Sequence, residues 1–163
     1  MATEPKKTLR ATAKANGDFI DLRTLSGYRL AMLDCEGKHY HLPVNVSNED
    51  LGRAVADVLS ASRLLNPKLT ASLSERVPAC YEEWVSATIA EHQYRDRRAM
   101  FRKMRSCGIE NDGDVIKFSP TKHKKLESWS GEGITPEDHV IVKVSSPADE
   151  IGAALRLALE RCI

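Results

Sequence analysis

The chain has 163 residues, and its 24 basic and 23 acidic side chains give a formal net charge of +1. This length suffices for one domain with a sizeable core, and 42% hydrophobic with 29% charged residues is an ordinary globular composition rather than a disordered or fibrous one. The balanced charge excludes a protein-wide basic field for nucleic acid, so electrostatic recognition must come from local patches.

The N-terminal segment, residues 1–10, is polar and carries lysine, without the apolar run of a signal peptide. No other segment approaches the roughly 20 apolar residues of a membrane-spanning helix. We therefore expect a cytoplasmic protein with a disordered tail over residues 1–7 and a single domain over residues 8–163. The four scattered cysteines are Cys35, Cys80, Cys107 and Cys162. An even number permits two disulfides, but in a reducing compartment we expect four separate buried thiols.

The first third of the domain is typical of two antiparallel hairpins. Asn16-Gly17 is a strong hairpin turn between two strand-like segments. A second gap that contains glycine, residues 34–37, separates two further segments rich in aromatic and aliphatic side chains. The four strands are expected over residues 8–15, 18–23, 28–33 and 38–44.

Two helices are predicted next. The first covers residues 47–63, because Ser47 can cap it and Asp50 stands three residues later, as in a capping box. Residues 69–77 are polar and mixed, and we interpret them as a loop, with room for one helical turn. Pro78 opens the longest helical pattern, which we expect to run to about Ser106 and to stop at Cys107-Gly108, with a break near His92-Gln93 as an alternative to one continuous helix.

The remaining third predicts a short strand over residues 115–118, a polar loop over 119–137 and a clear strand over 139–144. Ser146 is expected to cap a last helix, with Pro147 at its first position. The chain therefore predicts an α+β fold in one compact domain. Its parts are N-terminal antiparallel hairpins, a central long helical segment and a C-terminal strand-helix unit.

Two strand-helix segments, residues 39–63 and 139–163, align without a gap. Gly52 matches Gly152, one turn into each helix, and a glycine at this position lets its helix approach another backbone closely. An ancient repeat and convergent packing of strand-helix units both explain the likeness.

The sequence contains no complete motif of a common enzyme class, since each candidate lacks a residue that the chemistry requires. The glycines at 131 and 133 lie too close together for a phosphate-binding loop, and no nucleophile elbow or zinc spacing occurs. His39 and His41 share one face of a predicted strand but have no third ligand nearby in the sequence. Cys107 follows a predicted helix, whose negative C-terminal end disfavours a thiolate. We expect no catalytic residue, metal or cofactor.

A basic run occupies the second half of the predicted long helix, residues 95–105. It could serve a nucleic-acid-binding module, or it could be a solvated helix face without a ligand, and no ladder of exposed aromatic residues accompanies it. The residues of this alternative patch are Arg95, Arg97, Arg98, Arg102, Lys103 and Arg105.

Acidic residues gather in the turns, and a tryptophan stands among them. Trp129 lies in a loop rich in serine and glycine, where it either plugs the core or anchors an interface. A plugging role predicts that Trp129→Ala lowers the melting temperature, whereas a pure anchor would leave the fold intact.

The chain resembles the immunity proteins of bacterial contact-dependent growth inhibition systems, mainly over its C-terminal two thirds. The segments that carry this resemblance are Tyr81-Glu82-Glu83-Trp84, residues 97–107 (RRAMFRKMRSC), residues 126–131 (LESWSG) and residues 151–156 (IGAALR).

The resemblance implies a cytoplasmic antitoxin that binds the C-terminal toxin domain of a large cell-surface effector in a tight heterodimer, with neither a membrane nor a nucleic acid as partner. It implies no catalytic residue. Many such toxins are nucleases, whose substrate cleft is basic, so acidic side chains are the expected contacts. The expected toxin-binding residues are Asp112, Asp114, Glu127, Trp129 and Glu132.

Overall fold

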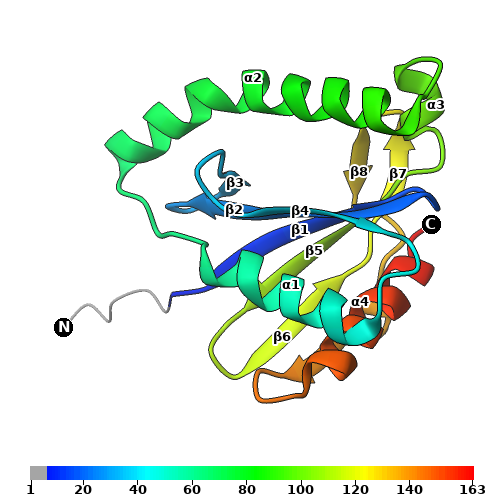
Figure 1. Ribbon diagram of the computed structural model, residues 1–163. Helices are drawn as coiled ribbons and strands as arrows, with labels where there is room; N and C mark the ends of the chain where they lie inside the picture. Colours follow the sequence, from blue (N-terminus) through cyan, green and yellow to red (C-terminus); the bar gives the residue numbers. More distant parts are fainter. Residues whose placement is uncertain (1–6) are drawn as a thin grey trace.

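The computed structural model describes residues 7–163, so the tail expected over residues 1–7 lies outside the described residues except for Lys7. The fold is built on a seven-stranded antiparallel sheet in the order β3-β2-β1-β5-β6-β9, with β4 also paired to β2 (Figure 1). Its strands are β1 (Leu9–Ala15), β2 (Phe19–Gly27), β3 (Ala31–Leu33), β4 (His39–Pro43), β5 (Arg105–Asn111), β6 (Val115–Ser119) and β9 (Val140–Lys143).

The first predicted hairpin is confirmed, and the second is wrong. β1 and β2 pair across the Asn16-Gly17 turn, where Gly17 has a φ of 95°, a conformation that glycine adopts without strain. β3 and β4 do not pair with each other. Both pair with the long β2, β3 along residues 25–27 and β4 along residues 19–23, so they form one interrupted edge.

The second helix begins earlier than predicted. α1 (Asn48–Ser60) starts as expected, and the Ser47 side chain accepts a hydrogen bond from the Asp50 amide. α2 (Pro67–His92) includes the segment expected as a loop, because Asn66 caps it and proline suits a first helical turn. Pro78 lies inside α2 on its exposed side, where water can hydrate the carbonyl that loses its partner.

The alternative of a break near His92-Gln93 is confirmed, and one continuous helix to Ser106 is wrong, because α2 ends at His92. Gln93 adopts the left-handed conformation that terminates a helix, and Asp96 caps the short α3 (Arg97–Phe101). Cys107 and Gly108 lie within β5 rather than at a helix end. The apolar residues of this region, Met100, Phe101 and Met104, are buried in α3 and the turn after it. Their spacing is also the spacing expected of a single long helix.

The C-terminal third follows the prediction with two differences. The segment expected as a loop carries a small hairpin, β7 (Lys122–Lys125) and β8 (Ser128–Ser130), and a 3₁₀ turn over Pro136–Asp138. α4 (Ala148–Glu160) has Pro147 rather than Ser146 at its N-cap.

One face of the sheet is apolar and is covered by α1 and α4 (Figure 1). The two helices approach at their glycines: a Cβ on Gly52 would lie 1.7 Å from the Ala148 carbonyl oxygen, and one on Gly152 would lie 2.0 Å from that of Asn48. The predicted close approach is therefore confirmed. The contact is reciprocal, since the glycine of each helix meets the first residue of the other helix.

The opposite face of the sheet lies beneath α2, α3 and the β7–β8 hairpin (Figure 1). A second apolar cluster closes the α3 end of this layer and contains Phe19, Trp84, Val85, Met100, Phe101 and Met104. Among residues 7–163, no helix is both long and apolar enough to cross a membrane.

Candidate functional site

The sheet face beneath α2 is polar. Side chains alternate between the two faces of a strand. Ile20 and Leu22 of β2 belong to the apolar core, so Asp21 and Arg23 between and after them point to the opposite face, toward α2. The register places Lys14 opposite Asp21, Asp21 opposite His41, and Arg23 opposite His39. The polar face comprises Thr12, Lys14, Asp21, Arg23, His39 and His41.

A hollow of about 310 Å³ lies between this polar face and α2. Tyr81 and Trp84 of α2 form its aromatic wall, β1 and β2 supply its polar floor, and β3 supplies an apolar rim. The lining residues are Thr12, Lys14, Asp21, Arg23, Leu25, Ala31, Met32, Leu33, Tyr81 and Trp84.

Two cations of the hollow are poorly compensated. Lys14 donates to the Ser106 hydroxyl at 2.9 Å and lies 4.6 Å from the Trp129 ring centroid, and burial lowers the pKa of Lys14 to about 8. Burial also lowers the pKa of Arg23, whose guanidinium lies over the Trp84 ring. Within residues 7–163, the buried Nη1 of Arg23 has no hydrogen-bond partner. An anionic group entering the hollow would satisfy these donors.

A carboxylate network joins α2, α3 and the β7–β8 turn beside the hollow. Arg97 donates two hydrogen bonds to Glu82, at 2.8 and 2.9 Å, and two to Glu127, at 2.8 and 2.7 Å. Tyr81 donates its hydroxyl proton to Glu127 at 2.8 Å. The Arg97 bonds hold the pKa of Glu127 below its usual value, and burial together with Glu127 raises that of Tyr81. Because bidentate pairs fix geometry, this network orders the hairpin against α2.

Only three of the five expected toxin contacts lie together. Glu127, Trp129 and Glu132 lie in or directly after the β7–β8 hairpin. Asp112 and Asp114 lie in the turn between β5 and β6, at the opposite end of the sheet in Figure 1. The structure thus divides the sequence-derived patch into two regions.

Trp129 has the contacts of a core plug. Its Nε1 donates to the Met104 carbonyl at 2.9 Å, and its ring packs on His123 and Phe101 with centroids 5.0 and 6.3 Å apart. Glu132 forms ion pairs with Lys122 and Lys124 at the surface. The hairpin therefore presents a fixed surface rather than a loose loop.

The basic run does not form the helical face that the sequence predicted. Its members are divided among a loop, α3, a turn and β5. Arg97 is engaged by two carboxylates, and Arg105 donates to the Leu159 carbonyl at 3.2 Å. The division removes the continuous basic helix on which the nucleic-acid alternative depended.

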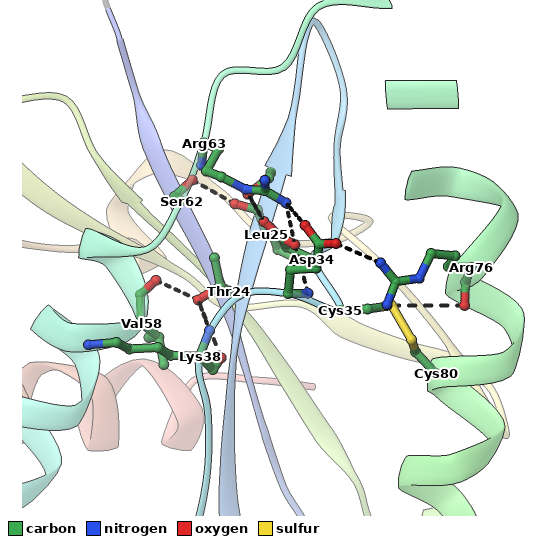
Figure 2. A network of polar contacts seen from close by, with 12 residues as sticks. Thr24, Leu25, Asp34, Cys35, Lys38, Val58, Ser62, Arg63, Arg76 and Cys80 are labelled. Atoms are coloured by element: carbon green, nitrogen blue, oxygen red, sulfur yellow. Dashed lines mark hydrogen bonds and ion pairs between the residues drawn. A yellow bond between two sulfur atoms is a disulfide. The ribbon is translucent and has the colours of Figure 1, made fainter. Parts of the chain in front are cut away.

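The expectation of four free thiols is wrong for two of them. Cys35 and Cys80 form a disulfide that joins the β3–β4 connection to α2 (Figure 2). Cys107 and Cys162 are free and buried. The two joined cysteines are 45 residues apart, and only the passage of α2 across the β3 edge brings them together.

Buried polar contacts reinforce the same junction (Figure 2). Asp34 accepts hydrogen bonds from Nε and Nη2 of Arg63, each at 2.9 Å, and from the Ser26 hydroxyl at 2.6 Å. Burial opposes its ionisation, but these donors lower the pKa of Asp34 overall. Arg76 of α2 pairs with Glu36 at 2.8 Å. The N-terminal half of α2 is thus fixed to the sheet edge.

Sequence reasoning missed the hollow. The segment Phe19–Arg23 does carry a signal of the polar face. Asp21 and Arg23 alternate with apolar residues in β2, a strand that has neighbours on both sides. A charged residue on a strand with neighbours on both sides predicts a polar layer above it. That the cover would be α2 could not be inferred without the tertiary arrangement.

The similarity to known proteins extends over nearly the whole chain. The family model described as "CdiI: CDI immunity protein" matches residues 9–162. Immunity protein CdiI-YPIII of Yersinia pseudotuberculosis is 42% identical over 170 aligned positions, covering 96% of each protein.

Two solved structures are similar to this fold. A CdiA-CT/CdiI toxin and immunity complex from Yersinia pseudotuberculosis contains a chain that is 41% identical, with a TM-score of 0.88 over 96% of this chain and 98% of that one. A protein of unknown function from Neisseria meningitidis is 32% identical, with a TM-score of 0.87 and full coverage of both chains.

Proposed function

Since the chain belongs to the CDI immunity protein family, we propose that it binds and neutralises the toxin domain of a cognate contact-dependent growth inhibition effector. The observation that carries the proposal is its 41% identity, over nearly its whole length, to a chain from a toxin and immunity complex. It acts in the cytoplasm, forms a one-to-one heterodimer with the toxin and performs no catalysis of its own.

We further propose that the toxin is a nuclease and that binding covers its active site. The support is electrostatic: a nuclease cleft is basic, and this chain displays carboxylates on fixed turns. Such a binder gains affinity when its surface is ordered before association, because little conformational entropy is then lost. The hairpin held by Arg97 and Trp129 has this property.

The contact surface we propose is the hollow beneath α2 together with the β7–β8 hairpin, including Glu127, Trp129 and Glu132. The hollow offers the unpaired Nη1 of Arg23 and the buried ammonium group of Lys14 to an acidic side chain of the toxin. At the hairpin, basic residues of the toxin would compete with Lys122 and Lys124 for Glu132. Opposite charges side by side would fix the orientation of the partner as well as attract it.

The experiment is co-expression of the toxin with variants of this chain, together with titration calorimetry of the purified pair. Arg23→Leu and Glu132→Lys should each weaken binding at least tenfold and reduce protection of the cells. Asp114→Lys has the same charge change as Glu132→Lys but lies at the other end of the sheet, and it serves as the matched control.

Three outcomes separate the parts of this proposal. Loss of protection with Asp114→Lys, but not with Glu132→Lys, would transfer the contact to the β5–β6 turn. Full protection by a chain substituted at Asp112, Asp114, Glu127, Trp129 and Glu132 together would exclude all five as contacts. Undiminished nucleic-acid cleavage by the bound toxin would contradict the occlusion of a nuclease site.

A further inference from the structure

The polar sheet face ends in a cluster of histidines and carboxylates where α2 terminates. His41 lies on β4 directly opposite Asp21 of β2, and Glu91 and His92 are the last two residues of α2. The elements meet here because α2 crosses the sheet and its C-terminal end comes to rest over the β4 edge (Figure 1).

Three ligand atoms converge at this point. His41 Nε2 lies 2.7 Å from His92 Nε2 and 3.7 Å from a carboxylate oxygen of Glu91. All three atoms, one from each residue, lie within 4.8 Å of one another. Two imidazole nitrogens and one carboxylate oxygen form a recurrent protein donor set for zinc, with a fourth position left for water.

Asp21 fixes the tautomer that metal binding requires. Its Oδ2 can only accept, so the His41 Nδ1 at 2.8 Å must donate to it, and the lone pair of His41 then resides on Nε2 and faces His92. Asp21 is itself buried and is held by the Trp84 indole nitrogen at 3.0 Å and by His39 at 2.7 Å. A carboxylate that orients a liganding histidine is a regular feature of zinc sites.

The imidazole rings are also held in place by packing. Phe19 lies beneath both, with ring centroids 4.4 Å from His41 and 5.0 Å from His92, and Tyr94 stacks on the other side of His92 at 5.6 Å. Glu91 remains exposed, so an ion has a path from solvent. The C-terminal end of α2 contributes negative dipole potential, which favours a cation at this position.

We propose that His41, His92 and Glu91 bind a divalent transition-metal ion, with zinc the best match, and that Asp21 positions His41 for it. Without metal, His92 Nε2 donates a hydrogen bond to His41 Nε2, so metal binding requires the His92 proton to move from Nε2 to Nδ1 through solvent. With metal, Zn–N distances of about 2.1 Å in a tetrahedral site would place the nitrogens roughly 3.4 Å apart, somewhat farther than the 2.7 Å observed. The ion would tie the end of α2 to the sheet edge.

The test is calorimetric titration of the metal-free full-length chain with Zn²⁺, with Mg²⁺ as a hard cation that this donor set should not select. Wild type should bind one Zn²⁺ and melt at a higher temperature with it. Co²⁺ should give the visible absorption bands of a tetrahedral site. His92→Ala and Glu91→Gln should each weaken Zn²⁺ binding at least tenfold.

Two controls keep the assignment decisive. His139→Ala removes a histidine that lies outside the cluster and should leave Zn²⁺ affinity unchanged. Glu91→Gln changes an exposed side chain, so it reports on the site even if His92→Ala fails to fold. Absence of Zn²⁺ binding by wild type, or equal binding by wild type and both cluster variants, would overturn the proposal. Since toxin is absent from the assay, the result does not depend on the proposed function.

Discussion

Lys14 shows how a single buried charge can serve binding at the expense of stability. Burial lowers its pKa from 10.5 to about 8, so near neutral pH the folded protein keeps a charged ammonium group in a poorly solvated position. Between about pH 8 and 10.5 the unfolded chain binds more protons at this residue than the folded one, and its contribution to the free energy of unfolding rises with pH across this interval.

We expect Lys14→Met to raise the free energy of unfolding at pH 7 by about 1 to 3 kcal/mol, since the desolvated charge is removed while its apolar stem is kept. Urea denaturation at pH 7 and pH 10 measures this. The gain should shrink at pH 10, where wild-type Lys14 has lost its proton. The same variant should bind the toxin more weakly, as is common when function maintains an unfavourable charge. A less stable variant at pH 7 would contradict this account.

Trp129 is a second residue whose role the structure sharpens. We expect Trp129→Ala to destabilise the protein by roughly 2 to 4 kcal/mol, because it leaves a cavity beside Phe101 and an unsatisfied Met104 carbonyl. Thermal melting of Trp129→Ala and Trp129→Phe distinguishes packing from the hydrogen bond, since phenylalanine retains most of the ring. An alanine variant that melts with wild type would restore Trp129 as a pure interface anchor.

At the scale of elements, the crossing of α1 and α4 depends on the absence of two side chains. We expect Gly52→Ala to destabilise the fold by about 1 to 3 kcal/mol, because the added Cβ would meet the Ala148 backbone. Backbone atoms cannot move aside as readily as the end of a flexible side chain. Chemical denaturation measures the change. Gly131→Ala is the matched control, since a Cβ there would meet nothing within 4 Å. Equal stability of the two variants would show that the helices can separate freely.

The Cys35–Cys80 disulfide is the covalent part of the junction between α2 and the β3–β4 connection. Closing a loop with a sequence separation of 45 stabilises a fold by about 4 kcal/mol in the chain-entropy model. We therefore expect Cys80→Ser to lower the free energy of unfolding by up to this amount under oxidising conditions. Adding reductant should bring wild type to the level of the variant. A wild-type stability that does not respond to reductant would contradict the prediction.

For the whole molecule, the sequence predicted the parts whose determinants are local. The Asn16-Gly17 hairpin, the Ser47 cap and the strand over residues 139–144 each depend on a few neighbouring residues, and all are present. The approach of Gly52 to α4 was also foreseen, because two matched glycines carry the signal themselves.

What could not be predicted depends on which segments meet. The helical pattern over residues 78–106 is divided by a break after His92, and only beyond α3 does the chain enter the centre of the sheet as β5. The hollow, the disulfide and the histidine cluster all arise where α2 crosses the sheet, and each joins residues tens of positions apart. No third candidate ligand was visible beside His39 and His41 in the sequence, because the fold rather than the local spacing brings Glu91 and His92 to His41.

The unequal covering of the two sheet faces gives the molecule two levels of local stability. α4 buries six of its 13 residues against the apolar face, whereas α2 buries four of 26, and its fixed points are the disulfide junction and the aromatic cluster near α3. Native-state amide hydrogen exchange should therefore find the first turns of α2, residues 67–72, where no side chain is buried, opening well before α1 and α4 exchange. The turns of α2 over the hollow are held by the Cys35–Cys80 disulfide and by buried Trp84, so the hollow should stay covered while the exposed start of the helix opens.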